Sequence, residues 1–362
     1  MPAIAGADVA VVGLGVAGSV LAARLAQEGF RVVGYDLSRR YVKPCGEQIT
    51  VDERSAALLR WVGQDVVKTV VDRVDVYVAG RPVATASVRP GRWVIVDKSE
   101  LVERLRSMAK EYGASLKLGV AARVQSLDAP MVVDARGPYV HGPSGEVLAV
   151  RVIAKVSSWD PQLARLDFRP RDRGLYWVFP SDGEGKLVNV GAGFVGVSDA
   201  TAVASVVLEY LKETVSREFQ VIDVRGAPID AFSRPRLVRG RAILVGEAAG
   251  LVMTWSGEGN RPAIGSALAL SDAIAANPGD HAEVLAAYSS AVGDLLVNAM
   301  VSRLAYFSVT AFRAPEDLLA SLPRPLWEGY VAQELSLEDV ARGVLGSLST
   351  LAGLRPAFSW RS

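Results

Sequence analysis

The stretch DVAVVGLGVAGSVLAARLAQEGFRVVGYD, residues 8–36, decides the fold. It opens with an apolar, β-branched run, which is the composition of a buried parallel strand. Glycines follow at Gly13, Gly15 and Gly18, and the remaining residues predict a helix and then a second strand that ends at Asp36. Together these elements predict a βαβ unit.

The three glycines and the acidic residue have separate expected tasks in binding a dinucleotide. Gly13 makes the tight turn, Gly15 lets backbone N–H groups approach a pyrophosphate, and Gly18 lets the helix pack on the strand. The N-terminus of the helix offers unpaired donors and positive partial charge to the anion. Asp36 is placed to accept a hydrogen bond from a ribose hydroxyl. This spacing does not distinguish NAD from FAD.

Composition and charge exclude several classes of protein. The chain has 362 residues, half of them hydrophobic and 22% charged, so it is expected to fold into two domains with a generous core. Forty basic residues against 39 acidic ones leave a net charge of +1, too little to drive nucleic-acid binding. With one cysteine, Cys45, and two histidines, neither a disulfide framework nor the usual zinc site is expected.

Targeting signals are weak. The first 23 residues lack the basic segment of a signal peptide, and no later stretch reaches the roughly 20 apolar residues of a membrane span. A cytoplasmic protein is therefore expected, with any membrane contact peripheral.

A second segment repeats the pattern of strand followed by glycines. Residues 241–250 predict a buried strand that ends in Gly246-Glu247, and a loop with Gly257 and Gly259 then leads into a helix. If a cofactor lay extended across the sheet, Glu247 could accept from a ribityl chain, and the loop amides could approach a flavin carbonyl. An ordinary Rossmann loop in which Glu247 caps a helix is the alternative.

Several motifs resemble those of a known superfamily. Residues 1–50 and 97–124, the VVDARG strand at 132–137 and GEAAGLVMTWSGEGN at 246–260 are together similar to flavoproteins of the p-hydroxybenzoate hydroxylase superfamily. Within it, the chain resembles the geranylgeranyl reductases through KPCGEQ at 43–48, YWVFP at 176–180 followed by Gly191-Ala-Gly193, and AAGL at 248–251. The resemblance extends over about residues 1–310.

The resemblance implies FAD as the cofactor and an α/β fold. It implies a Rossmann-like FAD-binding domain, an inserted antiparallel-sheet substrate domain and a helical C-terminus. The implied cofactor-binding residues are Gly13, Gly15, Ala17, Gly18, Asp36, Cys45, Gly46, Lys98, Val124, Gly246, Glu247, Gly257, Gly259 and Asn260.

The sequence departs from the superfamily at some of these positions. Glu247 and Lys98 stand where the superfamily usually has Asp and often has Arg. Asn260 and Arg261 follow Gly259 where an apolar residue is more usual among the reductases, which leans toward the hydroxylases.

Strand-like runs with turn signals lie between the cofactor segments, at 72–88, 146–156 and 176–194, and they predict an antiparallel sheet built from two insertions. We expect the FAD-binding domain to comprise residues 1–71, 95–140 and 225–300. The substrate domain is expected at 72–94 and 141–224, and the helical C-terminal region at 301–362.

The residues expected to act on substrate come from the same motifs. In the reductases the KPCG loop lies against the flavin, so Cys45 is a candidate catalytic residue, although an isolated cysteine is usually a buried hydrophobe. Tyr176 is the second catalytic candidate. The resemblance implies that the wall of the substrate cavity carries Tyr176, Trp177, Phe179 and Trp255, whereas aromatic residues in strands are usually sheet core.

The resemblance implies an FAD-dependent reductase that saturates C=C bonds of geranylgeranyl chains in isoprenoid membrane-lipid precursors. Such an alkene needs a hydride and also a proton, whose donor is Cys45, Tyr176, a carboxylic acid or water. The electron donor is expected to be either transiently bound NADPH or a ferredoxin. A flavin monooxygenase acting on an aromatic or polyprenyl substrate, and a non-catalytic prenyl-lipid escort protein, are the alternatives.

Overall fold

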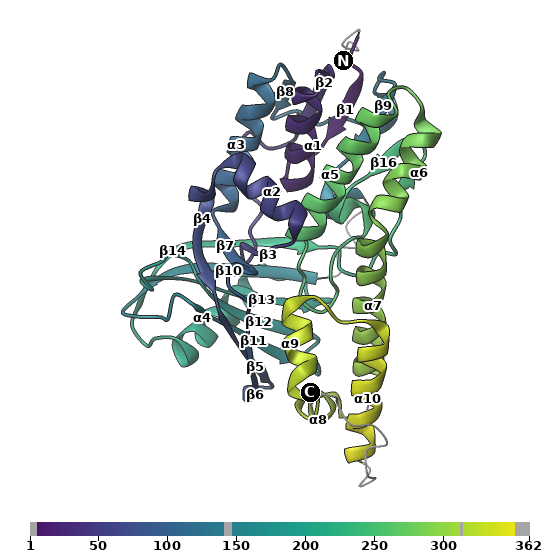
Figure 1. Ribbon diagram of the computed structural model, residues 1–362. Helices are drawn as coiled ribbons and strands as arrows, with labels where there is room; N and C mark the ends of the chain where they lie inside the picture. The colour runs from purple at the N-terminus through teal and green to yellow at the C-terminus, as the bar shows by residue number, and fades with distance from the viewer. Residues whose placement is uncertain (1–5, 141–146, 312–313, 352–362) are drawn as a thin grey trace.

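The computed structural model describes residues 6–140, 147–311 and 314–351 (Figure 1). At its upper end in this view, β1 (Val9–Val12), α1 (Val16–Gln27) and β2 (Val32–Asp36) form the expected βαβ unit. The two strands are parallel, with Val9 opposite Val32. All residues of β1 are buried, as expected for a β-branched strand in the middle of a parallel sheet.

The βαβ unit belongs to a six-stranded sheet of order β15-β16-β9-β1-β2-β8. Every pair in it is parallel except β15–β16. Helix α1 packs against both α3 (Lys98–Glu111) and α5 (Asn260–Ala276). The remaining strands are β8 (Ser115–Leu118), β9 (Met131–Asp134), β15 (Val238–Arg239) and β16 (Ala242–Leu244). This is the expected Rossmann-like layer.

A seven-stranded sheet of order β14-β10-β13-β12-β11-β5-β6 forms the second layer. Its pairs are antiparallel except β11–β5, where strands from the two insertions meet side by side in parallel. The predicted sheet is therefore mixed at this one pair. The strands are β5 (Arg73–Val78), β6 (Arg81–Ser87), β10 (Val147–Val156), β11 (Leu163–Arg169), β12 (Gly174–Pro180), β13 (Leu187–Val195) and β14 (Phe219–Ile229). Strand β14 continues past the boundary expected at residue 224.

Smaller elements connect the two layers. Strands β3 (Gln48–Thr50), β4 (Val67–Val71) and β7 (Trp93–Val96) form a three-stranded antiparallel sheet that the sequence did not predict. Helix α2 (Glu53–Val62) follows β3, and its N-cap Asp52 accepts from the Ser55 N–H. Helix α4 (Ala200–Thr214) covers one face of the seven-stranded sheet.

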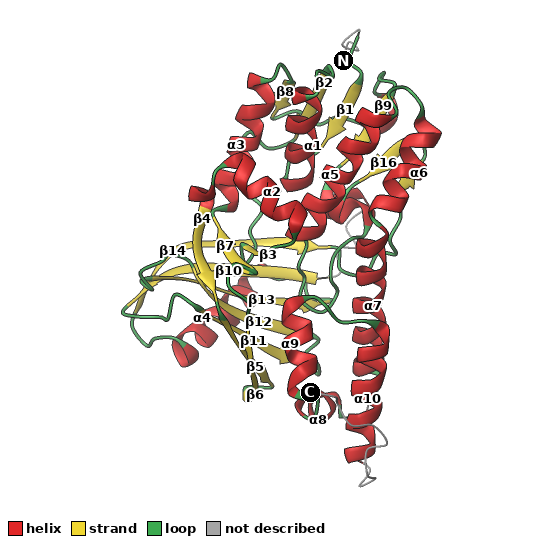
Figure 2. Cartoon of the chain, in the orientation of Figure 1, coloured by secondary structure: helices red, strands yellow, loops and turns green. Residues whose placement is uncertain are grey.

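The C-terminal part is helical, as expected (Figure 2). It consists of α6 (His281–Ala291), α7 (Gly293–Thr310), α8 (Pro315–Ala320), α9 (Arg324–Ala332) and α10 (Leu337–Leu351). Leu318, Trp327 and Val331 join a core cluster with Phe168, so α8 and α9 pack against the seven-stranded sheet on the face opposite α4. Residues 352–362 of the predicted C-terminal region lie outside the described residues.

Among the described helices, none has by itself the length and hydropathy of a membrane span. Helices α6 and α7 meet the criterion only as a pair, bent by 56°, and by length and composition alone.

Candidate functional site

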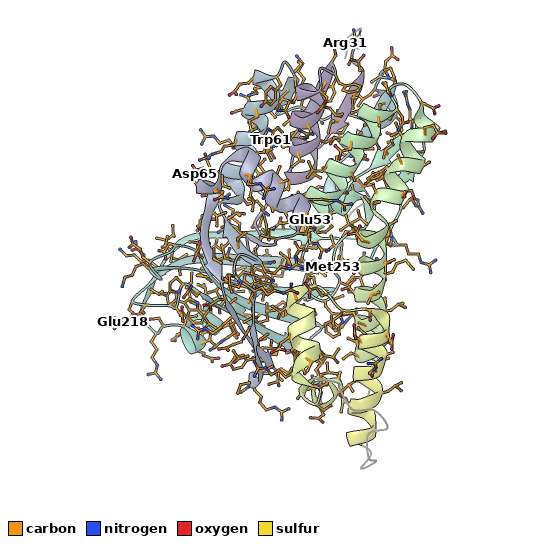
Figure 3. The ribbon with its side chains drawn as sticks, in the orientation of Figure 1. Arg31, Glu53, Trp61, Asp65, Glu218 and Met253 are labelled. Atoms are coloured by element: carbon orange, nitrogen blue, oxygen red, sulfur yellow. The ribbon has the colours of Figure 1, made fainter. Side chains whose placement is uncertain are left out.

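A cavity of ≈ 710 Å³ extends from the first glycine loop to the C-terminal helices. Its volume falls within the range of about 300–1,000 Å³ found for small-molecule and cofactor sites. Met253, which Figure 3 labels, lies on its wall where the two layers meet. Residues expected from the sequence that line the cavity are Gly13, Gly15, Ala17, Asp36, Cys45, Gly46, Lys98, Trp177, Phe179, Glu247, Trp255, Gly257, Gly259 and Asn260.

The glycine loop forms one end of this cavity. Gly13 has φ 92°, and a Cβ on it would lie 2.5 Å from the Ala135 carbonyl oxygen. A Cβ on Gly18 would lie 1.8 Å from the Gly13 carbonyl oxygen, so the close packing of α1 on β1 requires glycine there. At Gly15, by contrast, the nearest atom is 3.7 Å away, in the Tyr41 ring. Gly13 and Gly18 therefore serve the fold, whereas Gly15 leaves open space before the N-terminus of a helix.

Asp36 lies at the end of β2 and holds the same loop. Its carboxylate accepts from the Leu14 N–H at 2.7 Å and from the Ser38 N–H at 2.7 Å. Arg106, which is 2% exposed, lies 3.3 Å from Asp36 and donates to the Leu14 carbonyl oxygen at 2.8 Å. The sequence prediction missed Arg106. The sequence signal that could have identified it is an arginine next to Leu105, on the buried side of α3.

Three motifs of the sequence meet at the opposite end of the cavity. A Cβ on Gly46 would lie 2.5 Å from the Phe179 ring, and one on Gly191 would lie 2.1 Å from the Trp177 ring. The two glycines thus make room for the two aromatic rings. Asn189, fully buried, accepts from Trp177 Nε1 at 3.0 Å and donates to the Cys45 carbonyl oxygen at 2.9 Å. The KPCG loop is therefore held against β12 and β13 by packing and by hydrogen bonds.

The position of Tyr176 differs from the one expected from the sequence. Successive side chains of a strand point to opposite faces, so Tyr176 lies behind the wall that Trp177 and Phe179 form. It packs against Phe194 and Tyr210 under α4 and does not line the cavity. The structure therefore contradicts its expected place as a catalytic and substrate-binding residue.

Cys45 lies on the cavity wall, and donors surround its sulfur. The Glu47 N–H donates to Sγ at 3.0 Å, and Asn260 Nδ2 lies 3.8 Å from Sγ. Lys98, which is 4% exposed, lines the same cavity as Cys45 and Tyr41, and its ammonium nitrogen lies 5.4 Å from the centre of the Tyr41 ring. Burial opposes the charge on Lys98, but these two partners raise the pKa of its ammonium group above the usual value, so Lys98 is charged at neutral pH.

The second predicted glycine segment divides into buried and cavity-facing positions. Gly246 is buried, and its N–H donates to Ser266 Oγ at 2.9 Å, away from the cavity wall. Glu247 lines the cavity, forms an ion pair with Lys43 and accepts from the Asp230 N–H at 2.9 Å. Asn260 donates to the Gln48 carbonyl oxygen at 2.8 Å, which ties the start of α5 to β3.

Val124 is the second position that differs from the expectation. It lies in a short 3₁₀ helix (Val124–Ser126) and packs with Val12 and Ala129 in a small core cluster. The cavity is lined instead by the preceding residues, Val120–Ala122. Three consecutive residues of this connection thus meet the cavity, whereas Val124 faces the core.

A buried polar cluster near the start of α5 was missed by the sequence prediction. Glu258, which is 8% exposed, accepts from the Arg261 N–H at 2.8 Å. Arg261 in turn donates to Asp52 at 3.1 Å and to Gln333 at 2.7 Å. Burial raises the pKa of the Glu258 carboxyl above its usual value, although the Arg261 N–H and charge oppose the shift. Gln333 comes from the end of α9, so its part in the site has no local signal in the sequence.

Comparisons with known proteins agree with this geometry. A family model described as the NAD binding domain of 6-phosphogluconate dehydrogenase matches residues 8–130. No curated protein matches the sequence.

Solved structures match over most of the chain. A geranylgeranyl bacteriochlorophyll reductase-like protein from Thermoplasma acidophilum has a TM-score of 0.70 at 16% identity, covering 96% of this chain and 98% of that one. PqsL, a probable FAD-dependent monooxygenase from Pseudomonas aeruginosa, has a TM-score of 0.64 at 17% identity, with 87% and 98% covered. The flavin-dependent brominase Bmp2 has a TM-score of 0.66 at 15% identity, with 94% and 93% covered. At these identities the likeness establishes the fold, a dinucleotide-binding layer joined to a second sheet and a helical end.

Proposed function

We propose that the protein is an FAD-dependent reductase that saturates C=C bonds of geranylgeranyl chains in isoprenoid lipid precursors. The observation that carries the proposal is the cavity. One end of it is an open glycine loop at a helix N-terminus, and the other is an apolar wall formed by Trp177 and Phe179. The Thermoplasma structure described as geranylgeranyl reductase-like supports the same reading.

The residues present fit an extended dinucleotide. Gly15 offers open space in front of α1, Asp36 lies beside it, and Glu247 lines the same cavity further along. These residues would hold the adenosine, pyrophosphate and ribityl parts, and Gly257, Gly259 and Asn260 would meet the ring system. When bound and reduced, FAD supplies the hydride that an unactivated alkene requires.

The chain's own residues then have to bind the prenyl chain and deliver a proton. Trp177, Phe179 and Trp255 supply apolar surface on the cavity wall, which suits a hydrocarbon without polar groups. Cys45 lies on the same wall, and we propose its thiol as the proton donor. Tyr176 is removed from this role by its position behind the wall.

The test begins with the visible spectrum of the purified protein, which should show bound, non-covalent flavin. The dithionite-reduced protein should then be reoxidised without oxygen by a geranylgeranyl lipid, and each turnover should add two mass units to the product. The donor of electrons, NADPH or a ferredoxin, would be identified by which one reduces the flavin.

Two other results would replace the proposal. The flavin monooxygenase reading, which the PqsL likeness favours, would take over if only oxygen reoxidised the protein and the substrate gained an oxygen atom. A colourless protein that co-purified with a prenyl lipid would instead indicate a lipid-binding escort.

A further inference from the structure

Glu247 lies where three of the sequence motifs meet. It belongs to the short 3₁₀ helix Gly246–Ala249 that follows β16. Its Oε2 pairs with the ammonium group of Lys43, in the KPCG loop. Its Oε1 accepts from the Asp230 N–H at 2.9 Å, directly after the end of β14. A Cβ on Gly137, the last residue of the VVDARG motif, would lie 3.3 Å from Oε2. The carboxylate is therefore held from three sides.

The pair between Lys43 and Glu247 is partly withdrawn from water. The side chain of Glu247 is 15% exposed and that of Lys43 is 27% exposed. Removing one member of such a pair leaves the other charge without compensation. Arg136, which adjoins Gly137, pairs with Asp134 at 2.6 Å. In the part of the chain that the structure describes, Lys43 is thus the cation that compensates Glu247.

Glutamate at this position has one more rotatable bond than the aspartate that the superfamily usually carries. A longer side chain loses more conformational freedom when it is fixed in one position. A partner that already holds the carboxylate reduces this loss when a ligand binds. An ionised carboxylate has about four acceptor sites, so both oxygens of Glu247 can still accept from ribityl hydroxyls. The pair with Lys43 can therefore prepare Glu247 for the cofactor without using up its acceptor capacity.

The same ion pair fixes one end of the KPCG loop. Two residues after Lys43, the Cys45 carbonyl oxygen accepts from Asn189 Nδ2 at 2.9 Å. The loop is thus attached through Lys43 to the layer of the six-stranded sheet and through Cys45 to the seven-stranded sheet. A cofactor that bound to Glu247 would contact a residue already tied to the loop that carries Cys45.

We propose that Lys43 is a positioning residue that holds the Glu247 carboxylate ready for the ribityl chain of FAD and ties the cofactor to the KPCG loop. Lys43 acts on FAD through Glu247 and not by its own contact with the pyrophosphate. The lysine fixes the longer side chain, which accounts for glutamate in the place of the usual aspartate. Because the proposal concerns cofactor binding, it holds for a reductase and for a monooxygenase alike, and its failure is separate from failure of the proposed reaction.

The test is a double-mutant cycle on FAD affinity. The full-length protein is freed of flavin and titrated with FAD, and binding is followed by flavin fluorescence. Lys43→Met should weaken FAD binding by about tenfold, because the Glu247 carboxylate loses its partner. In the background of Glu247→Gln, which has no charge to pair, the same substitution should change the affinity by less than about twofold.

Arg39→Met is the matched control. It also removes one positive charge from the segment before the KPCG loop, but Arg39 is exposed and is not among the described residues that line the cavity. Its FAD affinity should equal that of the unchanged protein. An equal loss for Arg39→Met and Lys43→Met would show that net charge alone is responsible, and would overturn the proposal.

A loss that is the same in both backgrounds of the cycle would also overturn the proposal, because Lys43 would then act on FAD directly. So would an unchanged affinity of Lys43→Met. If that variant does not fold, Glu247→Asp gives the decision. It carries the carboxylate that related flavoproteins usually have, but the shorter side chain draws back from Lys43, so FAD binding should weaken several-fold. Affinity equal to or tighter than that of the unchanged protein would contradict the proposal.

Discussion

At the dinucleotide end of the cavity, the backbone of one short segment forms the surface, whereas at the opposite end side chains from separate segments do. Residues 13–18 make their turn through contacts that a Cβ would break, at 2.5 Å for Gly13 and 1.8 Å for Gly18. At the other end, Cys45 is held by Asn189 and the wall is formed by Trp177 and Phe179. The first end depends on local sterics, and the second depends on how distant strands pack.

The largest expected effect is on the local end. Gly18→Ala should prevent stable folding or cost more than about 4 kcal/mol, because the new Cβ would lie 1.8 Å from a backbone oxygen. Gly15→Ala is the control at the same loop, since its Cβ meets no atom closer than 3.7 Å. It should fold normally and bind flavin more weakly. Thermal unfolding and flavin titration separate the two, and equal stability of both variants would show that the sterics are not decisive.

Asp36→Ala should have the next largest effect. It removes the acceptor for two backbone N–H groups and one partner of the buried Arg106, which should lower the free energy of unfolding by about 2–3 kcal/mol. Flavin affinity should fall as well. Asp65→Ala is the control, because Asp65, which is labelled in Figure 3, pairs with Arg104 on the surface, and the loss of this pair should not change stability measurably. Urea unfolding of both variants measures the loss in free energy of unfolding. Equal losses in the two variants would contradict the prediction.

A pair of substitutions on β12 tests the distant end. Trp177→Leu should raise KM for a prenyl substrate by about tenfold, a loss of about 1.4 kcal/mol of binding, because its ring lines the cavity. Tyr176→Phe should leave KM and kcat unchanged, since that ring lies on the other face. Steady-state kinetics per folded molecule test both variants. A slower Tyr176→Phe enzyme would contradict the prediction and would return Tyr176 to the site.

The smallest expected effect concerns the pH dependence of Glu258. Its raised pKa means that the stability it contributes is full below the unfolded value of about 4.3 and is lost as pH rises through the folded value. Glu258→Gln keeps an acceptor for the Arg261 N–H but does not ionise. As pH rises above about 5, the free energy of unfolding of Glu258→Gln should therefore increase relative to that of the unchanged protein. Urea unfolding at several pH values measures this, and parallel curves would be the contrary result.

The sequence could predict what depends on spacing along the chain. The βαβ unit, the roles of Gly13 and Gly18 within the fold and the start of α5 all follow from local pattern, and the structure has them. Tyr176 shows the limit of this reasoning. The motif identifies a strand, but only packing decides which of its alternating faces meets the cavity. Val124 lies in a 3₁₀ helix and not in a strand, but there too only packing decides which residues meet the cavity.

Residues that act from a distance carried little signal. Asn189 looks like an ordinary strand residue, and Gln333 belongs to a helix near the end of the chain. Their contacts with Cys45 and Arg261 join positions far apart in the sequence. A single sequence does not contain that pairing, because it arises only when the sheets and helices close on one another.

The parallel pair β11–β5 has a consequence for synthesis of the protein on the ribosome. Leu163 pairs with Arg73, so β5 leaves the ribosome well before its neighbour exists. The six-stranded sheet is completed later still, because β16 pairs with β9 and α5 packs on α1 only after residues 242–276 have been made. Long-range parallel pairing of this kind slows folding and leaves strand edges uncovered. The nascent chain should therefore depend on chaperones until α5 has emerged, and a truncation before residue 242 should aggregate rather than fold as a shorter domain.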